Sequence, residues 1–317
     1  MKEVIKAFAG RKILVIGDLM LDKYLFGDAE KISQEAPVPI VNIKREAFVL
    51  GGAANAANNI SSLGGKAFLI GLVGNDPAKQ LLIKKLNEAN INSDNILTDN
   101  SRTTTQKIRV LAQNQQLLRI DYEERSKSSP HIVKNILKSI KEIEGLEGIV
   151  VSDYSKGVIT EELLVGVKEY AKEKNLFIIV DPKPSNKNAY KNVFLITPNL
   201  KEAAEMSGKI IETTEDVNKV GDLLVKELGC KVLITRGKDG MSLFEEGKAP
   251  KHISTKAKEV YDVSGAGDTV IATLSLALSA GVNLESAVDL ANHAAGVKVG
   301  KLGTAPVYAE ELERSLE

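Results

Sequence analysis

A stretch near the C-terminal end of the sequence combines a glycine turn with a carboxylate. Asp262–Thr269 reads Asp-Val-Ser-Gly-Ala-Gly-Asp-Thr, and an almost unbroken apolar run to Ala280 follows it. Glycine lets the backbone come close to a ligand, and the residues from Asp268 onward are typical of the start of a helix. Free N–H groups at a helix N-terminus favour an anion such as phosphate. The stretch therefore predicts an anion-binding turn that opens a buried helix.

Asp268 would repel a phosphate, but it could serve as a base. If it accepts the proton of a substrate hydroxyl, the N–H groups of Gly265, Ala266 and Gly267 could hold the charge that develops on a transferring phosphoryl group. One turn would then supply both halves of phosphoryl-transfer catalysis. A glycine-rich turn with an aspartate helix cap would give the same pattern without catalysis, so both interpretations stay open on this stretch alone.

Composition excludes several classes of protein. The chain has 317 residues, 43% of them hydrophobic, which suits one large α/β domain or two smaller ones. Lys+Arg and Asp+Glu both number 42, so neither a nucleic acid nor an acidic membrane is an expected partner. The single cysteine, Cys230, cannot form an internal disulfide, and the charged N-terminus does not resemble a secretion signal. The apolar stretch Thr269–Val282 is shorter than the roughly 20 residues of a membrane span. We therefore expect a cytoplasmic protein.

Short apolar strands alternate with helical segments along most of the chain. This alternation is typical of right-handed β-α-β crossovers in a parallel sheet, whose ligand site lies along the C-terminal ends of the strands. The expected strands cover residues 12–16, 68–73, 148–151, 177–180, 193–196 and a segment from 232, and the expected helices cover 76–90, 131–143, 161–174, 284–298 and segments from 200 and 214.

Polar residues near the first strand are candidates for substrate binding. Asp18 and Asp22 could bind the hydroxyls of a polar substrate, although roles in a turn or a cap would also explain them. Gly51 and Gly52 open a helix of small residues. One turn into that helix, Asn55 could both donate to and accept from a hydroxyl, and close helix packing is the alternative.

A second group of polar residues lies in the middle of the chain. Asn199 and Glu202 are three residues apart at a helix start and hence on one face, which suits a hydrated Mg²⁺. An acidic residue in a first helical turn is also ordinary, because it complements the helix dipole. Thr235, Arg236 and Gly237 end a strand and could bring a hydroxyl, a guanidinium and bare backbone to a polyphosphate.

Two segments, about residues 24–48 and 102–124, have no helical period. The first contains two prolines in an alternating run, and the second alternates from 107 to 112, turns through polar residues 113–116 and returns as a strand. Strand pairs that are separated in sequence are stable only when they join in one sheet, so we expect a small β lid inserted in the domain. Its exposed face needs a cover, which either closure over the substrate or the same sheet of a second subunit could supply, so we expect a homodimer through the lid.

The order of these motifs resembles that of the ribokinase-like (PfkB) sugar kinases over essentially the whole chain. The resemblance implies a single α/β domain over residues 1–317, built as a three-layer α/β/α sandwich with a mostly parallel central sheet and a β lid. It implies transfer of the ATP γ-phosphoryl group to a sugar hydroxyl with Asp268 as base, the glycine turn as anion hole and Mg²⁺ at Asn199 and Glu202 through water. The turn at Gly51–Asn55 would contact the sugar. A monovalent cation near Asp262 stays open. The motifs are Gly51-Gly52 with Asn55, Asn199 with Glu202, Thr235-Arg236-Gly237, and Asp262 with Gly265-Ala266-Gly267-Asp268.

The same resemblance implies a nucleotide site. Its expected residues are Asn199, Glu202, Thr235, Arg236, Gly237, Gly240 and Asn292.

Narrower motifs are similar to those of the heptose-7-phosphate kinase domain of ADP-heptose biosynthesis. This likeness implies phosphorylation of the anomeric C1 hydroxyl of D-glycero-D-manno-heptose 7-phosphate to the 1,7-bisphosphate. The motifs are Gly17-Asp-Leu-Met-Leu-Asp-Lys-Tyr24, Ile32-Ser-Gln-Glu-Ala-Pro-Val-Pro39, Arg109-Val-Leu, Gln115-Gln-Leu-Leu-Arg119 and Ser152-Asp-Tyr-Ser-Lys-Gly157. The expected heptose-side residues are Asp18, Asp22, Glu35 and Asn55, with Arg109 and Lys156 for the 7-phosphate.

Two alternatives remain beside the heptose phosphate kinase. One is another PfkB kinase that acts on ribose, fructose, a fructose phosphate or a nucleoside, and the other is a nucleotide-binding scaffold without catalysis. The sequence ends at Glu317 without the nucleotidyltransferase domain of the fused form of this family, so we expect a separate protein to convert the product.

Overall fold

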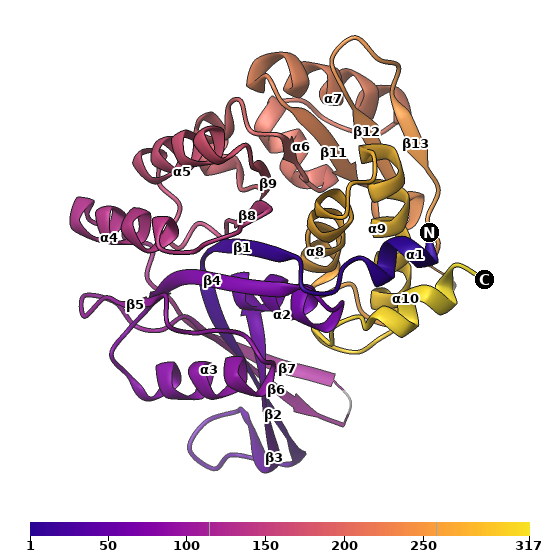
Figure 1. The fold of residues 1–317 in the computed structure, drawn as a ribbon. Helices are drawn as coiled ribbons and strands as arrows, with labels where there is room; N and C mark the ends of the chain where they lie inside the picture. Colours follow the sequence, from indigo (N-terminus) through magenta and orange to yellow (C-terminus); the bar gives the residue numbers. More distant parts are fainter. Residues whose placement is uncertain (114, 258) are drawn as a thin grey trace.

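The computed structural model describes residues 1–113, 115–257 and 259–317 (Figure 1). In these residues a nine-stranded sheet runs in the order β13-β12-β11-β10-β9-β8-β1-β4-β5. Its neighbouring strands pair in parallel from β5 to β11, whereas the β11–β12 and β12–β13 pairs are antiparallel. The strands are β1 (Lys12–Gly17), β4 (Lys66–Val73), β5 (Ile96–Thr98), β8 (Gly148–Ser152), β9 (Phe177–Asp181), β10 (Leu195–Ile196), β11 (Lys231–Thr235), β12 (Met241–Phe244) and β13 (Lys251–Ile253).

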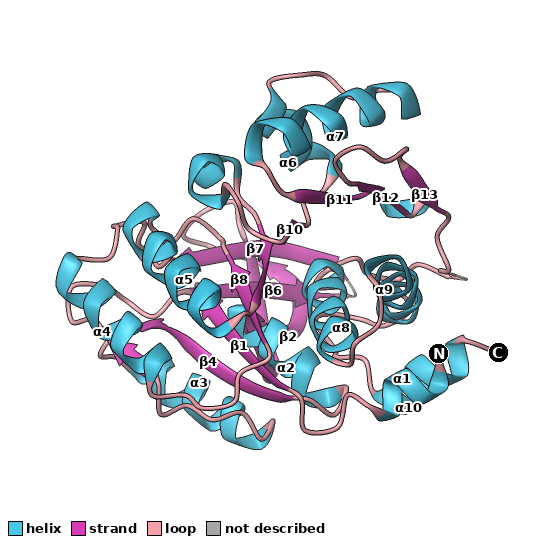
Figure 2. Ribbon diagram, turned by 45° about the horizontal axis from the view of Figure 1, so that its top comes forward, coloured by secondary structure: helices cyan, strands magenta, loops and turns pink. Residues whose placement is uncertain are grey.

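Helices cover both faces of this sheet (Figures 1 and 2). The described helices are α1 (Lys2–Lys6), α2 (Ala53–Ser62), α3 (Pro77–Glu88), α4 (Pro130–Lys141), α5 (Glu161–Lys174), α6 (Leu200–Ser207), α7 (Thr214–Leu228), α8 (Ala266–Ser279), α9 (Leu284–Val299) and α10 (Ala309–Ser315), with short 3₁₀ helices at Pro184–Tyr190 and Gly237–Asp239.

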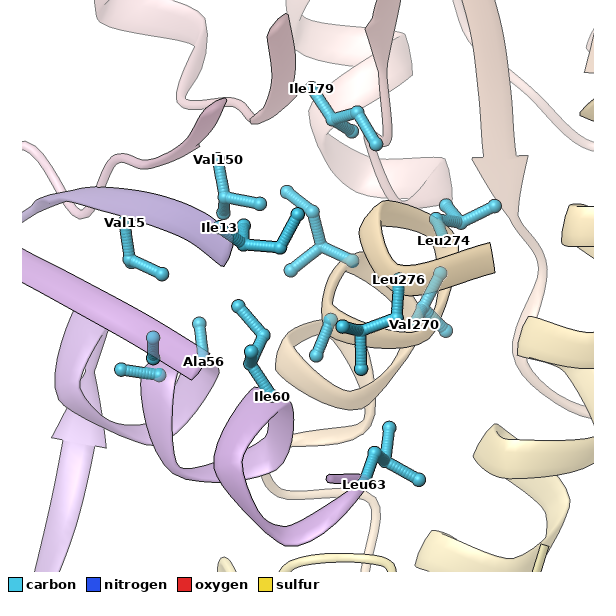
Figure 3. Packing of buried hydrophobic residues seen from close by; sticks show 14 of the residues in the cluster. Ile13, Val15, Ala56, Ile60, Leu63, Val150, Ile179, Val270, Leu274 and Leu276 are labelled. Atoms are coloured by element: carbon cyan, nitrogen blue, oxygen red, sulfur yellow. The ribbon is translucent and has the colours of Figure 1, made fainter. Parts of the chain in front are cut away.

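Strand β1 shows why the fold has three layers. Its side chains alternate between two faces, and all four central residues are buried. Ile13 and Val15 pack in the core shared with α2, α8 and α9 (Figure 3). Leu14 and Ile16 pack in a second core with α4, α5 and α7. Because both faces are apolar, the strand needs helices on both sides, and the expected α/β/α sandwich is confirmed.

Helix α8 lies inside the protein. Its residues Asp268–Ala277 are all buried, as expected for a helix that is apolar all round. Val270, Leu274 and Leu276 of α8 belong to the buried core that this helix shares with the sheet and α2 (Figure 3). Among the described residues, no helix combines the length and the apolar character that crossing a bilayer requires.

The expected lid is a separate four-stranded sheet with the order β3-β2-β6-β7. It extends from the layered body beside α3 (Figure 1). Its strands are β2 (Leu19–Ile32), β3 (Pro39–Gly52), β6 (Gln106–Ala112) and β7 (Gln115–Tyr122). The β2–β3 pairing runs from Leu19 opposite Gly52 to Ile32 opposite Pro39. The first lid segment therefore extends beyond the expected 24–48 at both ends, because β2 begins directly after β1.

Other differences from the sequence expectation are local. The strand expected at 193–196 is reduced to β10, whose two residues pair with both β9 and β11. The expected polar turn at 113–116 includes residue 114, which lies outside the described residues. The short elements α1, β5, β13 and α10 were not expected, because three to seven residues are too few to show a clear hydrophobic period.

Candidate active site

A cavity of about 700 Å³ lies beyond the C-terminal ends of β9, β10 and β11 and beside the N-terminus of α8. This is the edge at which parallel sheets bind ligands. The cavity brings together most of the residues expected to bind nucleotide or phosphate: Asn199, Glu202, Thr235, Gly237, Gly240, Ala266, Gly267 and Asn292. Lys183, Lys238, Asp181 and Tyr154 also line it.

The glycine turn before α8 requires glycine at residue 265. Gly265 has φ = 77°, in the left-handed region, and a Cβ there would lie 2.8 Å from the Asn55 side chain. Ala266 donates its N–H to the Val263 carbonyl at 3.2 Å, within the turn. The next two N–H groups, of Gly267 and Asp268, lie in the first helical turn, where no intrahelical acceptor exists, whereas the Thr269 N–H already donates to the Gly265 carbonyl at 3.1 Å. The start of α8 can therefore present N–H groups and the positive end of the helix dipole to an anion.

Asp268 lies in the first turn of α8 and is buried, with 4% of its surface exposed. Its Oδ2 accepts a hydrogen bond from Asn55 Nδ2 at 2.6 Å, and its Oδ1 accepts one from the Tyr154 hydroxyl at 3.0 Å. Burial raises the pKa of Asp268 to about 6, although both hydrogen bonds stabilise the charged form. A carboxyl group with this pKa is suited to accept a proton near neutral pH.

Asn199 and Glu202 form the N-terminal cap of α6. Asn199 Oδ1 accepts the Glu202 N–H at 2.9 Å, and Glu202 Oε2 accepts the Asn199 N–H at 3.0 Å. The other oxygen of Glu202 is paired with Lys183. The capping box explains the three-residue spacing, and it also holds both side chains at the wall of the cavity.

Two carboxylates, Asp181 and Glu202, line this cavity. Burial raises the pKa of Asp181 well above its usual value, and the charges of Asp268 and Glu202 add to the effect. The pairing with Glu202 raises the pKa of Lys183, although burial opposes it. In the described part of the chain, no three His, Cys, Asp or Glu side chains are grouped closely enough to hold a metal ion by themselves. Mg²⁺ usually binds one or two carboxylates together with substrate phosphates and water, so this donor set fits Mg²⁺ that arrives with a nucleotide.

The guanidinium of Arg236 is not brought into the cavity. Its nitrogens donate to Thr214 Oγ1 at 2.9 Å and to Ser242 Oγ at 3.2 Å, and Arg236 is not among the residues that line the cavity. The described cations of the cavity wall are Lys183 and Lys238. In the sequence, the polar cluster Asp181-Pro182-Lys183 at a strand end indicated that Lys183 could lie at the site. Nothing in the sequence indicated the direction of the Arg236 side chain.

Asp18 holds the loop after β8. Its oxygens accept the N–H groups of Tyr154, Lys156 and Val158 at 2.8, 3.1 and 3.1 Å. Burial raises the pKa of Asp18 and the charge of Asp153 adds to this, while the three N–H groups oppose it. The Asp18 carboxylate is thus engaged by backbone, and its position fixes Tyr154 beside Asp268.

The turn at the end of β3 contacts the same region. Gly52 has φ = 57°, and a Cβ there would lie 2.4 Å from the Asp18 carbonyl oxygen. Gly51 lies against the Asp22 carboxylate, since a Cβ at Gly51 would lie 2.9 Å from Asp22 Oδ2. Both glycines therefore allow the lid strand to approach β2 and enter α2, which carries Asn55.

Three cations lie near one another on this side of the site: Lys107 and Arg109 of the lid strand β6, and Lys156 of the loop after β8. Arg109 Nη1 pairs with Asp22 Oδ1 at 2.8 Å, and Lys156 pairs with Glu123. Lys107 lies 5.9 Å from the centre of the Tyr154 ring, and burial lowers its pKa. The ion pairs found in the described residues do not include Lys107.

Glu35 does not lie with the other residues expected on the heptose side. It is exposed on the connection between β2 and β3, where its N–H donates to Ser33 Oγ at 3.1 Å.

Tyr154 was not singled out from the sequence. Two signals were available for it: it follows Ser152-Asp153 in a polar cluster at a strand end, and it lies within the motif Ser152–Gly157 that resembles the heptose-7-phosphate kinase domain. Its hydroxyl reaches a residue 114 positions away, and the Lys107 and Lys183 ammonium groups lie 5.9 and 5.4 Å from the centre of its ring. Only the fold shows that this side chain contacts Asp268.

The chain has curated relatives over nearly its whole length. It is 41% identical over 315 residues to the bifunctional protein HldE of Desulfatibacillum aliphaticivorans, which covers 99% of this chain and 64% of that protein. It is 44% identical over 305 residues to the bifunctional protein HldE of Geobacter sulfurreducens, which covers 96% of this chain and 62% of that protein. The chain thus spans less than two thirds of the length of these relatives.

Solved structures share the fold. Ribokinase of Arabidopsis thaliana, complexed with ribose and ATP, superposes with a TM-score of 0.75 at 20% identity, covering 97% of this chain and 99% of that one. Phosphofructokinase-2 of Escherichia coli, in complex with substrates and products, has a TM-score of 0.78 at 19% identity, covering 96% and 97%. The family described as "pfkB family carbohydrate kinase" matches residues 11–311 of this chain. The chain therefore belongs to the pfkB family of carbohydrate kinases and is an ATP-dependent sugar kinase.

Proposed function

We propose that this kinase transfers the γ-phosphoryl group of ATP to the anomeric C1 hydroxyl of D-glycero-D-manno-heptose 7-phosphate and forms the 1,7-bisphosphate. The observation that carries the catalytic part is the buried Asp268 carboxylate, which lies at the start of α8 between Asn55 and Tyr154. We propose residues 1–317 as a single kinase domain with the lid inserted in it.

Asp268 is proposed to accept the proton of the sugar hydroxyl as its oxygen attacks the γ-phosphorus. The hydrogen bonds from Asn55 and Tyr154 fix the orientation of the carboxylate. The N–H groups at the start of α8, with Gly265, Ala266 and Gly267, would face the charge that develops on the transferring group. The base and the anion site lie on the same helical turn, so a small backbone shift would disturb both.

The cavity at β9, β10 and β11 is proposed to bind ATP. Its polar wall includes Thr235 and Asn292, and its volume of about 700 Å³ lies in the range of ligand sites of this size. Asn199 and Glu202 would hold, through water, the Mg²⁺ that accompanies ATP and that neutralises phosphate charge when bound. Lys183 lies next to Glu202 and could contact a nucleotide phosphate.

The choice of heptose phosphate is supported by the relatives and by the charges of the lid. Relatives 41 to 44% identical to this chain are named HldE, a bifunctional protein. A sugar phosphate also needs cations away from the ATP site. Arg109 and Lys156 were expected for this role, but both already have carboxylate partners. Lys107 is half-buried, lies near both, and is proposed as the third phosphate ligand.

A nucleotidyltransferase is proposed to consume the bisphosphate. A kinase for another sugar, a sugar phosphate or a nucleoside is the second candidate, because the base and the anion site would serve any hydroxyl acceptor. The geometry around Asp268 disfavours a scaffold without catalysis. Burial of a carboxylate costs stability, and buried carboxylates with a raised pKa are typical of functional sites.

A substrate panel separates the candidates. With an ADP-coupled assay, we expect the highest kcat/KM for one anomer of D-glycero-D-manno-heptose 7-phosphate over ribose, fructose, fructose 6-phosphate and nucleosides. Lys107→Met should lower kcat/KM for the heptose phosphate by about tenfold or more, the value of one charge-assisted hydrogen bond, and leave kcat/KM for a neutral sugar unchanged. Lys31→Met, which removes an exposed lid lysine, is the matched control. A preference for a neutral sugar would refute the assignment.

Asp268→Asn should bind ATP with nearly normal affinity but lose turnover by a factor on the order of 10² or more, because an amide cannot accept the proton. Asp222→Asn, on the exposed face of α7, should behave like the unchanged protein. ATP affinity is measured by calorimetry and turnover by ADP release. Turnover within a few fold of the unchanged protein would contradict the role of Asp268 as base.

The pH dependence of the activity should reflect the ionisation of Asp268. The base must be ionised, so kcat should fall about tenfold per unit as the pH drops below about 6, and reach a plateau above it. Tyr154→Phe removes a donor that favours the charged form, so the midpoint should move to higher pH by about one unit. Tyr190→Phe loses a buried hydroxyl that donates to Asp153 and should leave the midpoint unchanged. An unmoved midpoint in Tyr154→Phe would argue against the contact.

We propose a homodimer through the lid. Every residue of β7 is exposed, including Leu118 with 54% of its surface and the neighbouring Ile120 and Tyr122. Leu118→Asp combined with Ile120→Asp should convert the dimer to a monomer in sedimentation equilibrium, because a charge in an apolar interface is costly. Val165→Asp, which places the same charge on exposed α5, should not. A monomeric parent protein at tens of micromolar would contradict the proposal.

A further inference from the structure

Lys298 is a charged residue that the proposed chemistry does not use. It lies in the last turn of α9, and its exposed fraction is 0%. Lysine is almost never fully buried unless its ammonium group has a partner. Lys298 is not among the residues that line the nucleotide cavity, although its neighbours Val299 and Gly296 are. Lys298 therefore lies close to the proposed ATP site without lining it.

The hydrogen bonds of Lys298 lead to the glycine turn. Lys298 Nζ donates to the Gly303 carbonyl at 2.8 Å, and the Gly303 N–H donates to Asp262 Oδ2 at 2.9 Å. The other oxygen of Asp262 accepts the N–H of Ser264 at 2.8 Å. Ser264 directly precedes Gly265 and the start of α8. A chain of hydrogen bonds thus joins the end of α9 to the turn that opens α8.

Backbone contacts reinforce this link. The N–H groups of Tyr261 and Asp262 donate to the Val299 carbonyl at 2.8 and 3.2 Å. The two segments, 261–265 and 298–303, therefore meet along their length. Helices α8 and α9 also pack side by side, so the turn has α9 as its rigid support (Figure 2).

The charges of Lys298 and Asp262 support each other. Burial lowers the pKa of Lys298, and the charge of Asp262 opposes this effect. Burial also acts against ionisation of Asp262, but the N–H groups of Ser264 and Gly303, with the charge of Lys298, hold its pKa below the usual value. A neutral side chain in place of Lys298 would leave the Gly303 carbonyl and the Asp262 carboxylate without their cation.

We propose that the ammonium group of Lys298 is a positioning group that fixes the anion-binding turn through Gly303 and Asp262. It holds the N–H groups at the start of α8 in the orientation that a transferring phosphoryl group needs. The inference rests on phosphoryl transfer by this family and not on the identity of the sugar.

The proposal predicts a loss in kcat more than in binding. An anion site acts on charge that develops in the transition state, so its misplacement lowers kcat while KM for ATP changes little. Removal of a direct donor in such a site costs about 10²- to 10³-fold in kcat. Lys298 acts through two other residues, so we expect a loss of about tenfold or more for Lys298→Met.

The experiment compares Lys298→Met and Lys298→Ala with Lys301→Met. Lys301 lies in the same loop, but its ammonium is bound to the Pro306 carbonyl and to Glu311, away from the turn. We measure kcat and KM for ATP with the best acceptor of the substrate panel, ATP hydrolysis without acceptor, and the melting temperature. Lys298→Met should lose kcat in both reactions, and Lys301→Met should keep it.

Chemical rescue separates positioning from a general loss of structure. Ethylammonium should restore part of the kcat of Lys298→Ala, because it can place an ammonium group in the space that the lysine leaves. Tetramethylammonium, which cannot donate a hydrogen bond, should not. Normal kcat in Lys298→Met, or a kcat loss that ethylammonium leaves unchanged in a folded Lys298→Ala, would overturn the proposal.

A second variant covers the case in which the lysine variants do not fold. Asp262→Asn breaks the same chain at a more exposed point and should also lower kcat with little change in KM for ATP. In a folded double variant with Lys298→Met, the two losses should not add, because both remove the same link. Unchanged kcat in Asp262→Asn, or fully additive losses, would count against the link.

Discussion

The site depends on a buried carboxylate that three distant segments hold in place. Asp268 comes from α8, Asn55 from α2 and Tyr154 from the loop after β8, and their side chains meet through two hydrogen bonds. Burial of a carboxylate is unfavourable unless donors surround it, so this contact requires all three segments to be placed accurately. The central sheet achieves this, because α2 and α8 pack on one face of it and β8 belongs to it.

A second buried carboxylate fixes the loop that carries Tyr154. Asp18 follows β1 and accepts three N–H groups from the loop after the neighbouring strand β8. This loop carries Tyr154, and the strand after Asp18 is the first strand of the lid. Asp18 thus links three parts of the protein: the central sheet, the first strand of the lid, and the loop whose Tyr154 contacts Asp268. A polar substrate that enters beneath the lid would meet side chains whose backbone is already fixed.

The cations around the site differ in their burial and in their partners. Lys298 is fully buried and bound to the loop behind the glycine turn. Lys183 is paired with Glu202 at the cavity wall, while Lys107 lies on the lid, 5.9 Å from the centre of the Tyr154 ring. The chain has no net charge, so any attraction for two phosphorylated substrates must come from this local arrangement.

The sequence by itself determined the layered fold and the presence of a glycine turn at a helix start, because strand alternation, helix starts and turn glycines are local properties of the backbone. It also indicated Asp268, Asn55, Asn199 and Glu202. Tertiary structure alone decided that Asn55 and Tyr154 contact Asp268, that Arg236 points away from the cavity and that the buried Lys298 donates to the Gly303 carbonyl. The direction of a long side chain depends on neighbours that are far away in the sequence. Burial, which sets the pKa of Asp268, likewise exists only once the layers have packed.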